Sequence, residues 1–347
     1  MTSATASVSL IDSLIRLSEH QELNKERAAI LSSLRNSGLP SNKHEEYRFT
    51  PISRAIEKAF SEKEIKAPSN FNGIIQKPIL DNCIRVIIRN GKIELPEASV
   101  LPEGLKIYKG PANSIESTDA FENAAVLFST EKLVIEASGL TEKLVLIDHQ
   151  ISTSEKPEWI NNIISLKVSG KGKLSVAEQW HYSDSVFVFY NQSMSSEVTK
   201  ESELNYFRFQ VAEGNLNQVY NSEIIQAENS LVNAFTLTTD GGIIRNNFSV
   251  VIDGEHAEAN LLGLYLLNGH TLADNHTVVD HRKPNSNSNE LFKGVISGNA
   301  KAVFNGKIYV RPDAQKTNAF QSNRNIVLSE NASVNTKPQL EIWADDV

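Results

Sequence analysis

The chain is 347 residues long, carries a net charge of −8 and contains one cysteine, Cys83. Hydrophobic residues make up 40% and charged residues 22% of it, which is ordinary for a globular protein with a substantial core. The acidic balance argues against phosphate-rich partners, so we expect binding to neither nucleic acid nor an anionic membrane surface. A single cysteine excludes an internal disulfide bond and a four-cysteine metal or cluster site within the chain.

The first stretch of the chain shows no targeting signal. Residues 1–20 contain no basic cluster and no long apolar run, so they match neither a secretory signal peptide nor a membrane span. We therefore expect a cytoplasmic protein, and the lone cysteine is compatible with a reducing compartment.

Residues 1–64 are predicted to form a helical segment. Apolar side chains recur at helical spacing in residues 10–15 and 28–34, and Gly38-Leu39-Pro40 ends this stretch. A second helix is expected after Thr50, a suitable cap, with Pro51 at the first helical position. The apolar residues behind these predictions are Leu10, Ile11, Leu14, Ile15, Ala28, Leu31, Leu34, Ile52, Ala55, Ile56, Ala59 and Phe60.

Helical periodicity fades after residue 64. Residues 65–164 are predicted to be a mixed region that leads into a β-structure, with a short strand at Cys83–Arg89 and a turn at Asn90-Gly91. Pro96, Pro102 and Gly104 interrupt the next stretch.

From residue 165 to residue 347 the pattern is strand and turn almost throughout. Phe207, Phe209 and Val211 alternate with polar residues, and turns rich in Asn, Gly, Asp and Ser separate such stretches. Regularly spaced short strands are typical of a β-sandwich or barrel, whereas a long uniform tract is also typical of a β-helix. The length of the tract and the lack of an interrupting helix favour the β-helix slightly.

Few residues suggest chemistry. The nearest approach to a phosphate-binding loop, Gly306-Lys307, lacks the first glycine and the final hydroxyl residue, so we expect no ATP hydrolysis. Cys83 lies in an apolar strand, where a cysteine usually acts as a small hydrophobe. The acidic pairs Glu45-Glu46 and Asp345-Asp346 are interpreted as solvated. One cluster could suggest a metal site and contains His270, His276, His281, Asp274 and Asp280. Its spacing matches no known ligand pattern, so the preferred interpretation is that these are turn and surface residues between strands.

Three ordered motifs occupy the C-terminal part of the chain. They read FNGKIYV at Phe304–Val310, AQKTNAFQSN at Ala314–Asn323 and KPQLEIWADDV at Lys337–Val347. This run resembles the core of the SufB/SufD family of iron–sulfur cluster assembly proteins. His281, Pro284, Ser288, Leu291, Lys293 and Gly294 also fit the family pattern.

Further matches resemble the SufD members of this family. Glu46–Pro51 looks like the family's E-x-W-[KR]-[YF]-T segment, with Tyr47 in place of tryptophan, and Asn90-Gly91 and Leu101–Gly104 look like SufD. SufB carries functional cysteines in its β-helix, and this chain has none after Cys83. A SufB-like paralogue remains the alternative.

The resemblance implies a mainly β fold, a right-handed parallel β-helix with a small N-terminal helical segment. It implies three parts, a helical segment at 1–64, a mixed region at 65–164 and a β-helix core at 165–347. The family continues after A-D-D-V with a K-C-x-H-G run and a helical segment, whereas this chain ends at Val347. The expectation is a chain truncated relative to the family, without that helical segment.

The resemblance also implies a function. The expected protein is a non-catalytic scaffold subunit that pairs with a SufB-like subunit and docks the SufC ATPase, although the docking segment is expected to be missing here. It would hold no cofactor of its own, because the whole complex assembles the iron–sulfur cluster, and it would form a homodimer in isolation. The partner interface is expected at Gln315, Thr317, Gln321, Asn323, Gln339, Glu341, Asp345 and Asp346.

Two functions from other classes compete with this hypothesis. Many β-helix proteins are polysaccharide lyases or hydrolases, which need charged groups clustered in a surface groove, and the sequence shows no convincing set. A purely structural β-solenoid without assembly partners is the other alternative.

Overall fold

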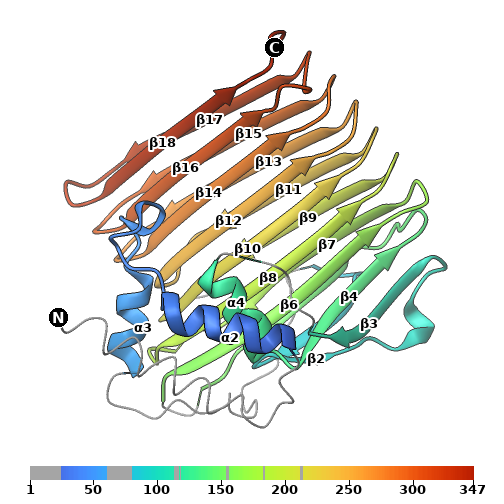
Figure 1. Cartoon of the computed structure of the whole chain (residues 1–347). Helices are drawn as coiled ribbons and strands as arrows, with labels where there is room; N and C mark the ends of the chain where they lie inside the picture. Colours follow the sequence, from blue (N-terminus) through green and yellow to red (C-terminus); the bar gives the residue numbers. More distant parts are fainter. Residues whose placement is uncertain are drawn as a thin grey trace.

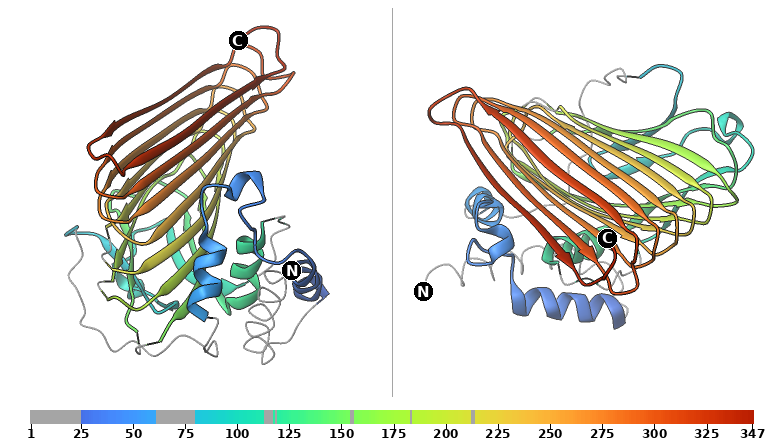
Figure 2. Two further views of the ribbon diagram at one scale, coloured as in Figure 1. Left: turned by 90° about the vertical axis from the view of Figure 1, so that its left-hand side faces the viewer. Right: turned by 90° about the horizontal axis from the view of Figure 1, so that it is seen from above.

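The computed structural model describes residues 25–60, 80–112, 117, 119–153, 156–182, 184–211 and 214–347. Its main body is a parallel β-solenoid of about seven turns, flanked by a few helices (Figures 1 and 2). The chain alternates between two nine-stranded sheets, so that each turn adds one strand to each sheet. The predicted mainly β fold with N-terminal helices is confirmed. The sandwich alternative is wrong, because the successive strands of each sheet pair in parallel.

The two sheets are defined by their strands. Sheet A contains β2 Lys92–Glu94, β1 Ile84–Arg89, β5 Val145–Gln150, β7 Lys173–His181, β9 Glu203–Gln210, β11 Leu231–Thr238, β13 Glu258–Leu267, β15 Asn287–Ile296 and β17 Asn318–Val327, in spatial order. Sheet B contains β3 Leu105–Pro111, β4 Glu131–Ala137, β6 Glu158–Val168, β8 Val188–Val198, β10 Leu216–Gln226, β12 Ile243–Ile252, β14 Leu272–His281, β16 Lys301–Val310 and β18 Ser333–Ile342.

Each coil places its side chains directly over those of the coil before it. Asparagines on the outer face of sheet A show this register, because Asn233 donates to Asn205, 28 residues away, and Asn318 donates to Asn287, 31 residues away. Period-two alternation sends every second side chain inward, where aliphatic and aromatic residues of both sheets form one continuous core. Apart from such asparagines, the repeat is one of position rather than of residue identity.

The parallel ladders begin before the boundary that the sequence pattern suggests. β1 pairs in parallel with β5, and β4 with β6, so coils are already present within residues 65–164. The predicted strand after Cys83 and the turn at Asn90-Gly91 are both present. Asn90 and Gly91 have positive φ angles of 44° and 83°, which suits the tight antiparallel hairpin of β1 and β2.

The helices lie against the outer face of sheet B (Figure 1). They are α2 Lys25–Ser37, the 3₁₀ turn η1 Glu45–Tyr47, α3 Ile52–Phe60 and α4 Ala120–Phe128, and a second 3₁₀ turn, η2 Ala98–Val100, precedes β3. Leu34, Ile56 and Phe60 pack with Phe121 and Trp159 in a second hydrophobic cluster. The predicted helices at 28–34 and after Thr50 are confirmed, and the prediction for residues 10–15 lies outside the described residues.

Candidate functional site: the terminal coil and the docked N-terminal segment

The C-terminal end of the solenoid is open. β17 is the last strand of sheet A and pairs with β15, and β18 is the last strand of sheet B and pairs with β16. We call residues 318–342, which contain these two strands, the terminal coil. One edge of each strand has no neighbouring strand in its sheet, so its backbone N–H and C=O groups can pair with another chain. Pro338 lies in β18, a position that an edge strand tolerates because proline has no N–H to donate.

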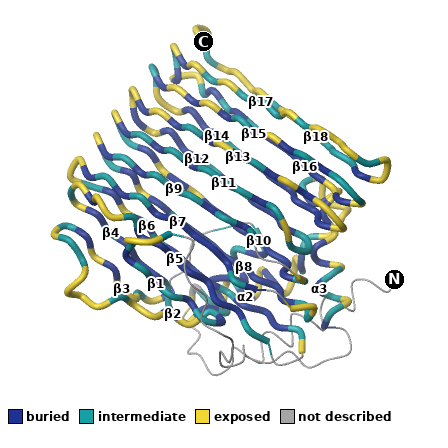
Figure 3. The backbone as a smooth tube through the Cα atoms, turned by 180° about the vertical axis from the view of Figure 1, so that it is seen from behind, coloured by how far each residue is buried: buried dark blue, intermediate teal, exposed yellow. Residues whose placement is uncertain are grey.

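Large apolar side chains are exposed on the terminal coil and just after it. Phe320 is 66% exposed, Leu328 63% and Leu340 55%, whereas the inward aromatic Phe304 one coil earlier is fully buried. Figure 3 shows many exposed residues along β17 and β18, near the C-terminus. Exposed apolar groups beside an unpaired strand edge are typical of a surface that another protein covers.

The eight predicted interface residues differ in burial and in their contacts, and six of them lie at the surface or in the turn before β17. Glu341, Asp345 and Asp346 are exposed, and Gln339 is half-buried beside Lys307 of β16. Thr317 is buried and donates to the carbonyl of Ala314 at 2.9 Å. Gln315 accepts from the backbone N–H of Asp346 at 2.8 Å, which ties the C-terminal residues to the turn before β17.

The remaining two predicted residues, Gln321 and Asn323, point into the solenoid. Gln321 Nε2 donates to Glu290 at 2.6 Å, and Asn323 Nδ2 donates to the hydroxyl of Tyr265 at 2.8 Å. Both side chains therefore hold the terminal coil onto the coil beneath it. The interface role of all eight residues stays a prediction.

The N-terminal segment docks on the outer face of sheet B through the motif that begins at Glu46. Arg245 on β12 is the centre of this contact. Its guanidinium donates to the backbone carbonyl of Glu46 at 2.6 Å and to Asp274 at 2.8 Å, and it lies 3.8 Å from the ring centroid of Tyr47. The Thr50 hydroxyl, which the sequence suggests as a helix cap, donates to Asp274.

Glu46 extends this contact towards the terminal coil. Its carboxylate lies 3.1 Å from His276 Nδ1 and accepts from Lys307 at 2.6 Å, and Glu45 pairs with Lys337 on β18 at 2.5 Å. The hydrogen bond from His276, together with Lys307, lowers the pKa of Glu46 to about 2, although partial burial opposes this shift. The interpretation of Glu45-Glu46 as merely solvated is therefore incomplete, because both carboxylates bind cations of the solenoid.

Two grooves flank the docked segment. One has a volume of about 310 Å³ and lies between Arg48, Phe49 and β18, and the other has a volume of about 630 Å³ and lies beside α4. Glu46 of the docked segment lines both grooves together with His276 and Asn305 of the solenoid, so the contact among these residues lies between the two grooves.

The histidine and aspartate cluster considered as a metal site is dispersed. His276 and Asp274 face the docked segment, with 2.9 Å between His276 Nε2 and Asp274 Oδ1. His281 points inward to Ser286 and Ser288, and Asp280 pairs with Arg311 at 2.6 Å on the outside. His270 is exposed in a turn. Within the part of the chain that the structure describes, no three His, Cys, Asp or Glu side chains are grouped as metal ligands.

Cys83 is half-buried just before β1. Its thiol donates to the carbonyl of Leu80 at 3.4 Å, and burial raises the pKa of the thiol. Both features disfavour the thiolate and agree with its interpretation as a small apolar residue.

A buried polar cluster in the first coils is absent from the sequence prediction. Glu178 is fully buried and accepts from His149 Nε2 and from Gln192, each at 2.9 Å. Tyr206 donates to Glu178 and accepts from the fully buried Arg208 at 2.7 Å. The signal was available, because Glu178 and Arg208 occupy inward positions in alternating strands, where a charge needs a partner.

Comparison with known proteins identifies the family. A family model described as the SUF system FeS cluster assembly, SufBD core domain, matches residues 151–347. The chain belongs to the SufBD family. It is SufD-like, because it is 26% identical over 331 residues to the iron–sulfur cluster assembly protein SufD of Escherichia coli, which covers 91% of this chain and 77% of that protein.

Other SufBD relatives match over shorter stretches. A SufBD family protein of Synechocystis is 32% identical over 148 residues, which are 43% of this chain and 33% of the relative. The chloroplastic protein ABCI7 of Arabidopsis thaliana is 28% identical over 194 residues, which are 54% of this chain and 40% of the relative. The resemblance stated from the motifs is confirmed, and the chain is a SufD-like member of an iron–sulfur cluster assembly family. Among the described residues, no helix has the length and apolar character needed to cross a membrane.

Proposed function

We propose that this chain is a non-catalytic scaffold subunit of a SUF assembly complex and pairs with a SufB-like subunit through its terminal coil. The observation that carries this proposal is the open end of the solenoid, where two ten-residue strands expose both an edge and large apolar side chains. A homologous partner with the same coil geometry would continue both sheets across the junction, since strand edges pair through their backbone groups.

The assembly role follows from family membership rather than from a reactive centre. The half-buried Cys83 is the only cysteine of the chain, so a cluster would need ligands from other subunits. The chain would then hold no cluster by itself and would work in the cytoplasm as a rigid platform, with the SufC ATPase supplying nucleotide turnover. A SufB-like paralogue with the same partners is the alternative within the family.

Co-purification tests this proposal. The chain is expressed with the SufB-like protein of the same organism, and retention of this partner is measured. Phe320→Asp and Leu340→Asp place charges on the terminal coil, and each should reduce retention of the SufB-like partner at least about tenfold. Leu266→Asp is the matched control, because Leu266 is a similarly exposed leucine on the outer face of β13, away from the terminal coil.

Loss of the partner in the Leu266 variant as well as the Phe320 variant would contradict an interface at the terminal coil. Retention of the partner by all three variants would place the contact elsewhere on the molecule. If the wild-type chain fails to retain the SufB-like partner, the scaffold assignment itself is wrong.

A further inference from the structure

Glu290 is an unusual residue in the coil beneath the terminal coil. It lies on β15 with 1% exposure, and its side chain points to the space between the two sheets. Thr277 of β14 donates to Glu290 Oε2 at 3.0 Å, and Gln321 of β17 donates to the same oxygen at 2.6 Å. The other carboxylate oxygen, Oε1, is buried without a hydrogen-bond partner. One oxygen of a buried carboxyl group is therefore unsatisfied.

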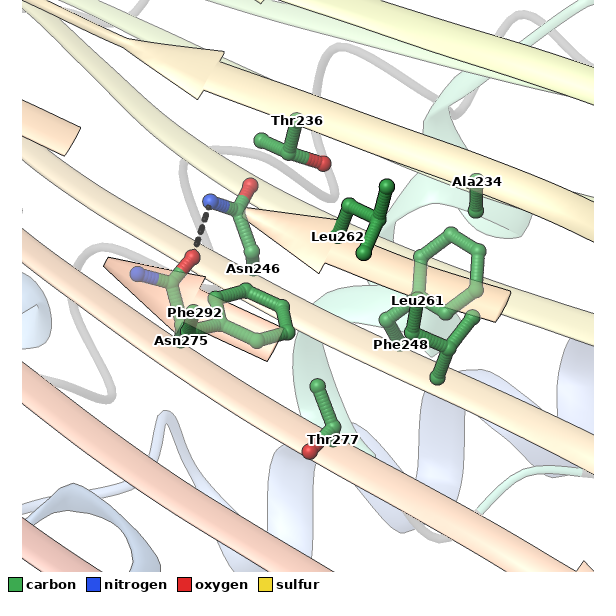
Figure 4. Close-up of a pocket in the computed structure, with 9 residues that line it drawn as sticks. All are labelled: Ala234, Thr236, Asn246, Phe248, Leu261, Leu262, Asn275, Thr277 and Phe292. Carbon is green, nitrogen blue, oxygen red and sulfur yellow. Dashed lines mark hydrogen bonds between the residues drawn. The ribbon is translucent and has the colours of Figure 1, made fainter. Parts of the chain in front are cut away.

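The surroundings of Glu290 hold no compensating cation. Its two hydrogen-bond donors are neutral, and Figure 4 shows Thr277 beside Asn275, Phe248 and Phe292 at a small cavity of about 20 Å³. In residues 214–347, all of which the structure describes, the other titratable side chains that point inward are Tyr220, Tyr265 and His281. The ring centroid of Tyr220 lies 4.4 Å from the guanidinium carbon of Arg208, within the polar cluster of the first coils. Tyr265 contacts Asn323 and Asn325, and His281 contacts Ser286 and Ser288.

Two other buried carboxylates, Glu178 and Asp274, have positively charged or imidazole partners. Glu178 lies beside His149 and is linked through Tyr206 to Arg208, and Asp274 pairs with Arg245. Burial raises the pKa of both groups, but the hydrogen bond from His149 and the charge of Arg208 lower that of Glu178 by more, and the charge of Arg245 does so for Asp274, so that both pKa values are lowered overall. For Glu290, burial dominates and raises the pKa to about 7, with Gln321 and Thr277 opposing the shift only in part. Its charge therefore changes near neutral pH.

Glu290 is joined to the surface that the proposed function assigns to the partner. Gln321 belongs to β17, and its amide group covers Gly306, where an added Cβ would lie only 2.1 Å from Gln321 Nε2. Gln321 therefore bridges the space between the sheets and separates Glu290 from the open end. If the terminal coil detached from the coil below, Glu290 would meet water, which stabilises the ionised form.

We propose that Glu290 makes closure of the terminal coil, and hence association through it, depend on proton binding. The protonated form is compatible with the dry site and favours the closed coil. The ionised form favours an opened coil in which water reaches the carboxylate. By reciprocity, a partner that holds the terminal coil closed raises the proton affinity of Glu290. The association part of this inference rests on the proposed function, and the closure part does not.

The direction of the pH effect follows from the raised pKa. The carboxyl group has an ordinary pKa of 4.5 when exposed and about 7 in the closed coil. Stability of the closed coil is therefore complete at low pH, falls as pH rises from about 4.5 to about 7 and stays low above that. His281 acts in the opposite sense at lower pH, because burial lowers its pKa to about 4. Because Glu290→Gln keeps His281, the difference between wild type and this variant excludes the contribution of His281.

Hydrogen exchange of the terminal coil in wild type and in Glu290→Gln tests the proposal. Glutamine keeps the shape of the side chain and cannot ionise. Between about pH 6 and about pH 8.5, the opening constant of residues 318–342 should rise about tenfold more in wild type than in the variant, after correction for intrinsic exchange. Glu330→Gln is the matched control, because Glu330 is exposed in the turn between β17 and β18 and should behave as wild type.

Equal pH responses of wild type and Glu290→Gln overturn the proposal. An infrared band of a protonated carboxyl group, present at about pH 6 and lost at about pH 8.5, should also be missing from Glu290→Gln. A band of unchanged intensity in that variant would also overturn the proposal, whereas a weaker residual band can come from Glu122, whose pKa burial also raises. The infrared comparison can be made even if the variant exchanges too fast to compare.

Sedimentation of each protein together with the SufB-like partner, over the same pH range, separates this inference from the proposed function. Weaker association of wild type at high pH, with unchanged association of the variant, supports both. If neither protein associates at any pH while the exchange difference is present, the proposed function and the association part fail and the closure part stands. Association without any pH difference between the two proteins overturns the association part alone.

Discussion

The two ends of the solenoid differ in their edge strands. At the N-terminal end, sheet A finishes in the three-residue strand β2 and sheet B in β3, and both run antiparallel to their neighbours. At the C-terminal end, both sheets finish in ten-residue parallel strands with apolar side chains exposed. Short edge strands and covering helices or loops are common protections against unwanted pairing, whereas a long open edge invites it. The contrast leaves the C-terminal end as the surface available to a partner.

The two ends of the solenoid also differ in how their buried charged groups are compensated. The first coils bury Glu178 and Arg208 within one hydrogen-bonded cluster, and Trp180 stacks on His149 with ring centroids 4.5 Å apart. The last coils bury Glu290 without a cation. A balanced cluster stabilises a fixed structure, while an unbalanced carboxyl group leaves its coil sensitive to solution conditions.

The largest expected effect comes from breaking the balanced cluster. Arg208→Met should lower the free energy of unfolding by about 3–5 kcal/mol, because it removes a fully buried cation and leaves Glu178 and Tyr206 with fewer partners. Denaturant unfolding monitored by tryptophan fluorescence measures this loss. The double variant Glu178→Gln with Arg208→Met should recover part of the stability, since no unbalanced charge remains. A single variant as stable as wild type would show that the cluster is not cooperative.

The next effect concerns association at the open end. The isolated chain should form a homodimer through its terminal coil, because two copies of an open edge can pair about a two-fold axis. Phe320→Asp should weaken self-association at least about tenfold and change the free energy of unfolding little, since Phe320 is 66% exposed. Sedimentation velocity over a concentration series measures the dissociation constant. A wild-type chain that is monomeric at the highest concentration would contradict the homodimer.

The sequence predicts the fold better than it predicts the contacts. Alternation in stretches such as Phe207–Val211 predicts strands, and the C-terminal motifs predict the family, but alternation alone does not separate a sandwich from a solenoid. The parallel pairing joins residues about one coil apart, as with Phe235 and Leu262, and only scattered asparagines such as Asn233 and Asn260 repeat at that distance. The prediction also begins the β-helix late, because the first coils contain short strands broken by turns and α4.

The site was partly predictable for similar reasons. The motifs point to the C-terminal strands, but only the structure shows that Gln321 and Asn323 point inward while Phe320 is exposed. Arg245 binds the backbone carbonyl of Glu46, which is 199 residues away in the sequence, so local patterns could not predict this contact. Long-range partners of this kind depend on the coil on which each residue falls, which the sequence alone does not give.

A smaller effect is expected where the docked segment meets the solenoid. Glu46→Gln should lower the free energy of unfolding by about 1 kcal/mol at neutral pH, because Glu46 is partly exposed and solvent screens its pairs with His276 and Lys307. The pKa of Glu46 is lowered from 4.5 to about 2 in the folded protein. Its contribution is therefore complete above about pH 4.5 and is lost as pH falls towards about 2.

Unfolding measured at several pH values tests this sign. The difference between wild type and Glu46→Gln should shrink as pH falls through that window. Glu255→Gln is a useful control, because Glu255 is exposed in the turn before β13. A difference that grows on acidification would mean that Glu46 is not stabilised as the anion.

The smallest effect is expected from a charge pair on the outside of the first coils. Lys167 on β6 and Glu197 on β8 lie 2.7 Å apart, and both side chains are about half exposed. Water solvates each charge whether or not the pair forms, so Lys167→Met should change the free energy of unfolding by less than about 0.5 kcal/mol. Added salt should reduce even this difference, because mobile ions screen exposed charges. Arg208→Met also replaces a cationic side chain with methionine in the first coils, but on the inner side of a strand. If both variants lost similar stability, burial would not be what makes the inner cluster important, and the contrast between Glu178 and Glu290 would lose its physical basis.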